Sequence, residues 1–144
     1  MNSRKRTGFS LIEVMIAMAI IALLTTIAFP SYQRYVTRSS RSAAQTELLE
    51  LANLQEKIYL NTNSYTVSVT GDYNGRSDGG LGKTAGTTAD GKYALSITPN
   101  AIPTQTYVIT AAPVVGSSQD GDGDITISSD GTRLYFAPGG TVPW

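Results

Sequence analysis

The chain has 144 residues with eleven basic and eleven acidic side chains, so its formal net charge at pH 7 is zero. It contains no cysteine and no histidine, which excludes disulfides, thiol chemistry, histidine acid–base catalysis and the common zinc sites. Because no pair of nucleophile and base suggests itself in such a chain, we predict that it is not an enzyme.

The N-terminal region is a short basic leader followed by a long apolar run. Arg4, Lys5 and Arg6 precede the run, and residues 14–29 carry no charge and only two polar side chains, Thr25 and Thr26. Counted from Phe9, the run reaches the roughly 20 residues that a helix needs to cross a bilayer. The sequence therefore predicts a membrane-spanning helix.

Glu13 is the one ionisable residue near the start of this apolar run. A secretory signal peptide is one interpretation, with Thr26-Ile27-Ala28 as its cleavage site, but a carboxylate inside the apolar region is untypical of signal peptides. A plain membrane anchor is a second interpretation. In either case Glu13 is costly within a bilayer unless it pairs with a cation.

The segment Gly8-Phe9-Ser10-Leu11-Ile12-Glu13 resembles the class III signal of type IV pilins and pseudopilins. The resemblance implies that a prepilin peptidase cuts after Gly8 and methylates the new amino terminus at Phe9. It also implies that Glu13 meets the N-terminal ammonium of a neighbouring subunit. This pairing is physically plausible, since each charge alone is expensive in an apolar bundle.

This resemblance divides the chain into a leader of residues 1–8, a membrane and filament-core helix of residues 9–30, and a globular region of residues 31–144. Without the leader, eight basic residues face eleven acidic ones, which gives a side-chain charge of −3. Basic residues also follow the apolar run, at Arg34, Arg38 and Arg41, so the positive-inside rule does not decide orientation. The resemblance implies a cytoplasmic N-terminus in the bacterial inner membrane, followed by export to a pilus at the cell surface.

The helix is predicted to continue beyond the membrane span to about Leu60. Pro30 removes one helical hydrogen bond and predicts a kink, because residues 31–60 contain no further Gly or Pro. An apolar stripe lies along this part, formed by Ala44, Leu48, Leu51 and Ile58 with Leu54 beside it. The opposite face is expected to carry Glu47, Glu50, Gln55 and Lys57. The turn-forming residues 61–64 end the helix.

Residues 61–91 are rich in Gly, Ser, Thr, Asn and Asp, which predicts a long surface loop with one short strand at residues 66–70. The last third of the chain shows apolar residues at alternate positions, as in half-buried strands. These alternating residues are Tyr93, Leu95 and Ile97, then Tyr107, Ile109 and Ala111, then Ile125 and Ile127. Ser129-Asp130-Gly131-Thr132 predicts a hairpin turn between residues 125–128 and 132–136.

The expected fold is therefore α+β: a long N-terminal helix packed on an antiparallel sheet of three or four strands. Residues 90–144 are also similar to the C-terminal domain of PilE-like minor pilins and ComP-like pilins. Members commonly have one cysteine just before the strand at 125–128 and another before the final tryptophan. Here residues 120–124 and Pro143 occupy those places, so the disulfide that closes this loop is absent.

Asp120, Asp122 and Asp124 alternate with glycines, a spacing that resembles the start of calcium-binding loops. We therefore consider calcium a candidate ligand that fastens this loop, with a solvated acidic turn as the alternative. The sequence predicts no other cofactor.

The leading functional prediction is a structural subunit of a type IV pilus, of the PilE-like minor type, whose partners are other pilins, the prepilin peptidase and the inner-membrane assembly machinery. Pilus functions such as adhesion and twitching motility are implied with it. The alternatives are a major pilin, a type II secretion pseudopilin, or a pilin that binds DNA during uptake. The last would require a patch of basic residues, for which the candidates are Arg76, Lys83, Lys92 and Arg133.

Overall fold

The computed structural model describes residues 9–100 and 105–144, which form one helix and five strands. The chain divides into two compact units, Met1–Val36 and Thr37–Trp144. In chain order the elements are α1 (Leu11–Thr62), β1 (Tyr93–Pro99), β2 (Tyr107–Pro113), β3 (Ile125–Ser128), β4 (Arg133–Ala137) and β5 (Gly140–Pro143). One long helix packed on an antiparallel sheet confirms the predicted α+β fold.

Helix α1 ends where the sequence predicts a turn. Asn63 adopts a left-handed conformation with φ of 55°, and its N–H donates to the carbonyl of Tyr59 at 2.7 Å. Asparagine tolerates this conformation better than most residues, and the bond satisfies a carbonyl of the last turn. The helix thus ends two residues beyond the predicted Leu60.

The apolar stripe of α1 is confirmed, since Ala44, Leu48, Leu51 and Ile58 are buried. The assignment of Glu47 and Gln55 to the opposite face was wrong, because both are also buried. At 100° per residue, Gln55 falls within the stripe, and Glu47 falls at its edge. The Gln55 side chain bonds both the carbonyl and the N–H of Thr66, at 2.8 and 3.0 Å, so the loop satisfies its amide inside the core.

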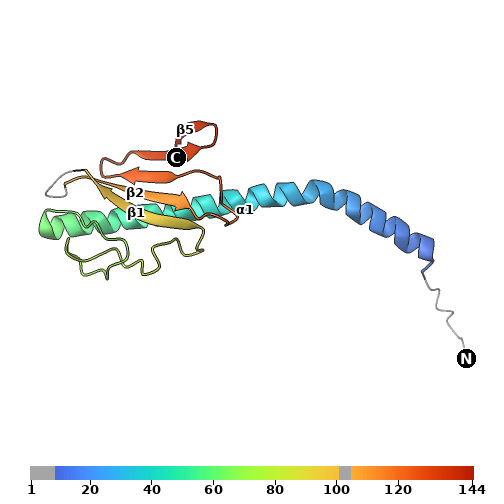
Figure 1. Ribbon diagram of the computed structural model, residues 1–144, viewed down its shortest axis with the longest axis horizontal. Coiled ribbons are helices and arrows are strands. Elements are labelled where there is room, and N and C mark those ends of the chain that lie inside the picture. Colours follow the sequence, from blue (N-terminus) through green and yellow to red (C-terminus); the bar gives the residue numbers. More distant parts are fainter. Residues whose placement is uncertain (1–8, 101–104) are drawn as a thin grey trace, which may run out of the picture. The chain divides into compact units, whose positions relative to one another are not determined.

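The five strands form one antiparallel sheet in the order of the sequence, β1-β2-β3-β4-β5 (Figure 1). The alternating residues of the last third lie in register with one another. Ile97 pairs with Ile109, and Ile109 pairs with Ile127, so one face of the sheet is continuously apolar. The predicted hairpin between β3 and β4 is confirmed by Gly131, whose φ is 84°.

Strand β5 was not predicted, so the sheet has five strands instead of three or four. It pairs with β4 through Ala137 and Gly140 at its start and Leu134 and Pro143 at its end. All four of its residues are exposed, so it shows no alternation of buried and exposed positions. The strand predicted at residues 66–70 is wrong, because that segment makes only a single bridge, between Ser68 and Gly80.

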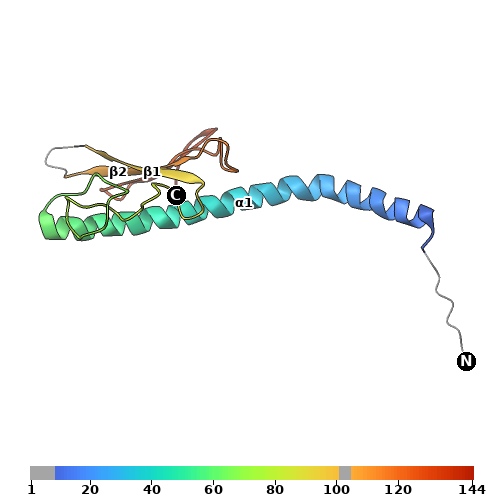
Figure 2. The ribbon, with the colours of Figure 1, turned by 60° about the horizontal axis from the view of Figure 1, so that its bottom comes forward.

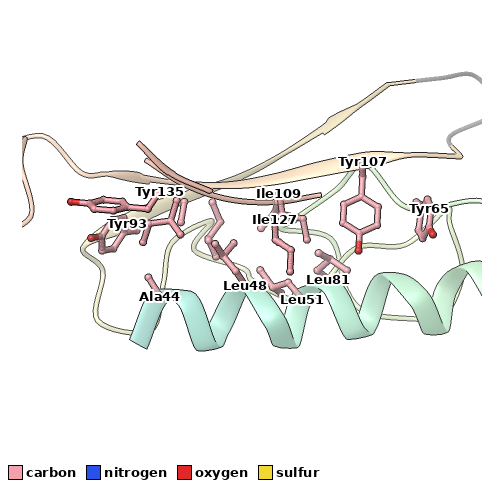
Figure 3. Packing of buried hydrophobic residues seen from close by; sticks show 14 of the residues in the cluster. Ala44, Leu48, Leu51, Tyr65, Leu81, Tyr93, Tyr107, Ile109, Ile127 and Tyr135 are labelled. Atoms are coloured by element: carbon pink, nitrogen blue, oxygen red, sulfur yellow. The ribbon is translucent and has the colours of Figure 1, made fainter. Parts of the chain in front are cut away.

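The hydrophobic core of the second unit lies between the sheet and the later turns of α1 (Figures 2 and 3). Figure 3 shows Tyr93 and Tyr135 near Ala44 at one end of this core, and Tyr107 near Tyr65 at the other. Every buried apolar side chain of the described residues lies in this unit. The globular unit therefore has a core of its own, with α1 as one of its two layers.

Candidate functional site

The start of α1 presents apolar side chains and one carboxylate to the surroundings. Phe9 is 81% exposed, and the apolar side chains from Leu11 to Phe29 are exposed as well. Glu13 lies in the first turn, where its N–H donates to the carbonyl of Ser10 at 3.0 Å. Among the described residues Glu13 makes no ion pair. Gly8, the predicted cleavage site, lies outside the described residues.

Pro30 lies inside α1, and the helix continues through it as predicted. Proline has no N–H, so the carbonyl of Thr26, four residues earlier, loses its usual donor. The hydroxyls of Thr25 and Thr26 donate to the carbonyls of Ile21 and Leu23, at 2.8 and 2.7 Å. The polar side chains of the apolar run are therefore satisfied within the helix, which is long and apolar enough to cross a membrane. The kink at Pro30 stays a prediction.

In the globular unit, Asp122 is the centre of a buried polar cluster. Its carboxylate accepts two hydrogen bonds from the guanidinium of Arg41, one of them from Nε to Oδ2 at 2.9 Å. The same guanidinium lies over the ring of Tyr135, 4.1 Å from its centroid. Only 6% of the Asp122 side chain is exposed, so water screens this ion pair little. The pair joins helix α1 to the acidic loop between β2 and β3.

Three neighbours complete this Asp122 cluster. The hydroxyl of Tyr93 donates to Asp122 Oδ2 at 2.7 Å, and the hydroxyl of Tyr135 donates to the Asp122 carbonyl at 2.6 Å. The amide of Gln119, itself buried, donates to the Tyr93 hydroxyl at 2.8 Å and to the Thr37 carbonyl at 3.2 Å. The loop between β2 and β3 is thus attached to the helix by a network of charged and polar bonds.

The three aspartates proposed as calcium ligands are not brought together. Asp120 accepts the N–H of Gly116 at 2.9 Å, Asp122 faces Arg41, and Asp124 is exposed just before β3. No group of carboxylates that could hold a metal ion occurs among residues 9–100 and 105–144. The expectation of a calcium site therefore finds no support in the geometry, because the central ligand is already neutralised by a guanidinium.

One of the glycines between these aspartates, Gly123, lies very close to the backbone of β4. Gly123 has a φ of 107°, and a Cβ atom there would lie 2.0 Å from the carbonyl oxygen of Phe136. Asp124, next along the chain, accepts the N–H of Phe136 at 2.8 Å through its own carbonyl. The glycine therefore allows the acidic loop to approach β4 closely, as only glycine does without strain.

Two of the four residues proposed to contact DNA are held against α1. The ammonium of Lys83 pairs with the buried carboxylate of Glu47, which also accepts the N–H of Ala89 at 3.1 Å. The ammonium of Lys92 donates to the hydroxyl of Ser40 at 2.6 Å. Both lysines therefore fasten the long loop to the helix.

The other two, Arg76 and Arg133, differ in their surroundings. Arg76 lies 3.5 Å from the carboxylate of Asp78, and Arg133 lies over the ring of Trp144 at 5.6 Å. The sheet register places Arg133 on β4 in one row with Ile97 on β1, three strands away. Ile97 in turn lies five residues beyond Lys92 along the chain. With the usual strand spacing, the backbones of Lys92 and Arg133 are about 20 Å apart. The four residues do not form one compact patch.

Comparison with known proteins finds a family match for each of two parts of the chain. Residues 3–29 match the prokaryotic N-terminal methylation motif, and residues 30–126 match the family described as type IV minor pilin ComP, DNA uptake sequence receptor. The chain belongs to the type IV pilins. Members of this family are structural proteins without enzymatic activity.

Individual relatives of this pilin agree with the assignment to the type IV pilins. It is 32% identical to a fimbrial protein of Pseudomonas aeruginosa over 118 residues, which is 82% of this chain and 76% of the relative. It is 40% identical to the type IV major pilin protein PilA of Myxococcus xanthus over 45% of this chain and 29% of PilA. It is 52% identical to the fimbrial protein EcpC of Eikenella corrodens over 31% of this chain. The last two alignments each span 29% of the relative's length.

The Asp122 cluster makes the stability of this pilin sensitive to acid. Burial alone raises the pKa of Asp122, but the hydrogen bonds from Arg41 and Tyr93 outweigh burial and hold the pKa below its ordinary value. The ion pair therefore stabilises the folded state above the unfolded-state pKa of about 3.9, and this stability is lost as the pH falls through the lower folded-state value. We expect the free energy of unfolding to fall between about pH 5 and pH 2.

Urea unfolding of the globular unit, followed by the fluorescence of its single tryptophan, Trp144, measures this dependence. In Asp122→Asn the side chain no longer titrates, so the acid-dependent loss should be smaller than in the unchanged protein. Asp90 and Asp130 also have lowered pKa values and remain in both proteins, so the difference between the two curves isolates Asp122. Parallel curves would show that Asp122 does not carry the effect.

Proposed function

We propose that this pilin is a ComP-like minor pilin, which enters a filament through α1 and binds DNA with its globular unit. The observation that carries the proposal is the match of residues 30–126 to the DNA uptake sequence receptor family. That match covers most of the globular unit, including Arg41, Asp122 and strands β1 and β2. A PilE-like subunit without a DNA ligand is thereby less well supported than the DNA receptor.

The assembly half of the proposal concerns the N-terminus. A prepilin peptidase cuts after Gly8 and methylates Phe9, and Glu13 then pairs with the terminal ammonium of a neighbouring subunit. The methylation motif over residues 3–29 supports this processing, and the exposed apolar side chains of α1 support its burial among other helices. Before assembly the chain lies in the inner membrane with its N-terminus in the cytoplasm, and the assembly machinery then moves it into the pilus.

DNA contacts are assigned to the exposed arginines of the globular unit. The processed chain has a net side-chain charge of −3, so attraction to phosphate must come from particular residues and not from overall charge. Lys83 and Lys92 are occupied by Glu47 and Ser40, which leaves Arg76 and Arg133 from the predicted set. Arg133 makes no ion pair in the described residues and lies beside an aromatic ring, a combination that suits contact with nucleic acid.

Fluorescence anisotropy of a labelled duplex with the chain lacking residues 1–30 tests this half. We expect binding at about 50 mM salt that weakens steeply by about 200 mM. The slope of log K against log salt should become shallower by about 0.9 for each phosphate that a variant no longer neutralises. Arg133→Gln and Arg76→Gln should each reduce the slope, whereas Lys57→Gln, at another exposed basic residue, should not.

A scrambled duplex of the same length distinguishes recognition of an uptake sequence from general attraction to phosphate. A receptor should bind the uptake sequence more tightly than the scrambled duplex at equal salt, because only base contacts and duplex shape differ between the two. No retention of either duplex at low salt would discard the receptor function.

A second candidate is a major pilin, favoured by the relatives of that description. The pilins of Myxococcus xanthus and Moraxella bovis, both named as major pilins, are 40% and 48% identical to this chain over their aligned parts. Quantitative mass spectrometry of sheared filaments separates the two candidates. A major pilin dominates the filament mass, whereas a minor pilin is a small fraction of it.

A further inference from the structure

Asn74 is the one asparagine of the chain that a glycine follows. The pair Asn74-Gly75 lies in the long loop between α1 and β1, and Asn74 is exposed. A Cβ atom built on Gly75 would meet nothing closer than the Asn61 amide, 3.5 Å away, and its φ of 74° is one that glycine adopts without strain. The peptide group that joins the two residues is therefore within reach of water.

Two hydrogen bonds hold the Asn74 amide in one orientation. Its Oδ1 accepts the N–H of Arg76 at 2.9 Å, and its Nδ2 donates to Oδ1 of Asp78 at 3.2 Å. The bond from Arg76 polarises the amide carbonyl and stabilises negative charge on its oxygen, as a backbone N–H does in an oxyanion hole. This orientation depends on Gly79, where a Cβ atom would lie 2.2 Å from the Asn74 Oδ1. The carbonyl carbon Cγ of Asn74 is therefore prepared for attack by a nucleophile.

The backbone N–H that follows Asn74 is not engaged elsewhere. In the described part of the chain the N–H of Gly75 donates no hydrogen bond, whereas the Gly75 carbonyl accepts one from Nδ2 of Asn61 at 3.0 Å. This nitrogen can therefore lose its proton to water without first breaking a bond within the protein. It is also the atom that closes a five-membered ring when it attacks Cγ of Asn74. One residue pair thus supplies both a polarised carbonyl and an unbonded nitrogen.

We propose that Asn74 is a site of spontaneous deamidation in the folded protein, which turns a neutral amide beside Arg76 into a carboxylate. The nitrogen of Gly75 loses its proton to solvent and forms a bond to Cγ of Asn74. The bond from Cγ to Nδ2 then breaks, and the departing nitrogen takes a proton from solvent to leave as ammonia. Water opens the resulting succinimide ring at either carbonyl, which gives aspartate or isoaspartate. In sum, one water is consumed and one ammonia is released, without oxidation and without an enzyme.

The new carboxylate changes the charge next to Arg76. The guanidinium of Arg76 already lies 3.5 Å from the carboxylate of Asp78, and both side chains are exposed. A carboxylate at position 74 loses the donor that now bonds to Asp78, and it lowers the positive potential that Arg76 offers to a phosphate. The reaction therefore weakens, with time, the DNA contact assigned to Arg76. This consequence rests on the proposed function, whereas the deamidation itself does not.

Incubation of the full chain in detergent micelles, followed by tryptic digestion and mass spectrometry, tests the reaction. Cleavage after Lys57 and Arg76 gives the fragment 58–76, in which Asn61 and Asn63 are internal controls. We expect the mass gain of an exchange of NH₂ for OH at Asn74 alone. The rate should rise from mildly acidic to mildly alkaline pH, because the attacking nitrogen must lose its proton. No gain at Asn74, or equal gains at the three asparagines, would overturn the proposal.

Gly79→Ala separates the effect of the fold from that of the Asn-Gly pair, which it leaves in place. The added methyl group displaces the Asn74 amide from the N–H of Arg76, so deamidation of the folded chain should slow by about tenfold. The unstructured peptide of residues 70–80 is the reference, and there the same substitution should change nothing. Urea unfolding followed by Trp144 fluorescence shows that the variant folds. Conversion of the peptide without conversion of the folded chain would mean that the loop protects Asn74, and the proposal would be wrong.

The DNA anisotropy assay measures the consequence. Asn74→Asp carries the charge of the product, and Asn74→Gln is its uncharged control. We expect Asn74→Asp to make the salt slope shallower, as Arg76→Gln does, and Asn74→Gln to leave it unchanged. Equal slopes for the two variants would refute the effect on DNA binding. If the unchanged chain retains no DNA, the receptor function fails, while the mass gain at Asn74 still decides the deamidation.

Discussion

We expect Arg41→Ala to lower the free energy of unfolding of the globular unit by about 3 kcal/mol. The substitution leaves the carboxylate of Asp122 buried without its cation, with 6% of its side chain exposed. It also removes the guanidinium that covers the ring of Tyr135. Truncating one partner of a buried pair costs much more than the pair gains, because the remaining charge is desolvated without compensation.

Chemical denaturation of the chain lacking residues 1–30, followed by Trp144 fluorescence, measures this loss. Trp144 is a suitable probe because its indole N–H donates to the carbonyl of Leu134 at 3.1 Å and its ring packs against the core. Arg38→Ala is the matched control, since Arg38 is an exposed arginine of the same helix, and its effect should be within about 0.5 kcal/mol. An effect of Arg41→Ala as small as that of Arg38→Ala would show that the cluster does not hold the loop.

The second large effect is expected from Glu13→Ala. The substitution should leave processing and membrane insertion intact but reduce the subunit in sheared filaments by more than about tenfold, relative to the membrane fraction. In the proposed assembly, the ammonium at Phe9 of a neighbour would then enter an apolar bundle unpaired, and an uncompensated buried charge costs several kcal/mol. Quantitative mass spectrometry of both fractions gives the ratio, and the intact mass shows whether the chain begins at methylated Phe9.

Glu50→Ala is the control, because Glu50 is an exposed carboxylate of the same helix in the globular unit. Glu13→Asp keeps the charge and should retain part of the assembly. Normal incorporation of processed Glu13→Ala subunits would exclude the pairing role. A chain that begins at Met1 would instead exclude processing, and with it the pilin-type assembly.

The fold was largely predictable because its main elements depend on local periodicity. Tyr93, Ile109 and Ile125 belong to period-two patterns, and each is buried in the strand that its pattern predicts. The helix followed from an apolar run and a stripe of 3.6-residue period. Strand β5 was missed because it is short and exposed on both faces, and the pairing that holds it in place leaves no periodicity in the sequence.

The polar contacts of the globular unit were not predictable in the same way. Asp122 was interpreted with its neighbours Asp120 and Asp124, but its partner Arg41 lies 81 residues earlier. Lys83 and Lys92 were interpreted as candidate DNA contacts, although their ammonium groups bond to the buried side chains of Glu47 and Ser40. No local spacing identifies such partners, since only the packing of the helix on the sheet brings them together. Tyr93 and Tyr135 gave a partial signal, because buried tyrosine hydroxyls need a polar partner.

The attachment of the acidic loop through Asp122 has a consequence for how the subunit matures. The chain contains no cysteine, and an ion pair attaches the loop between β2 and β3 to α1 without covalent chemistry. No oxidant, oxidoreductase or thiol exchange takes part, and these covalent steps take seconds to hours where they occur. The globular unit therefore needs no disulfide formation to reach its folded form, in oxidising or in reducing surroundings.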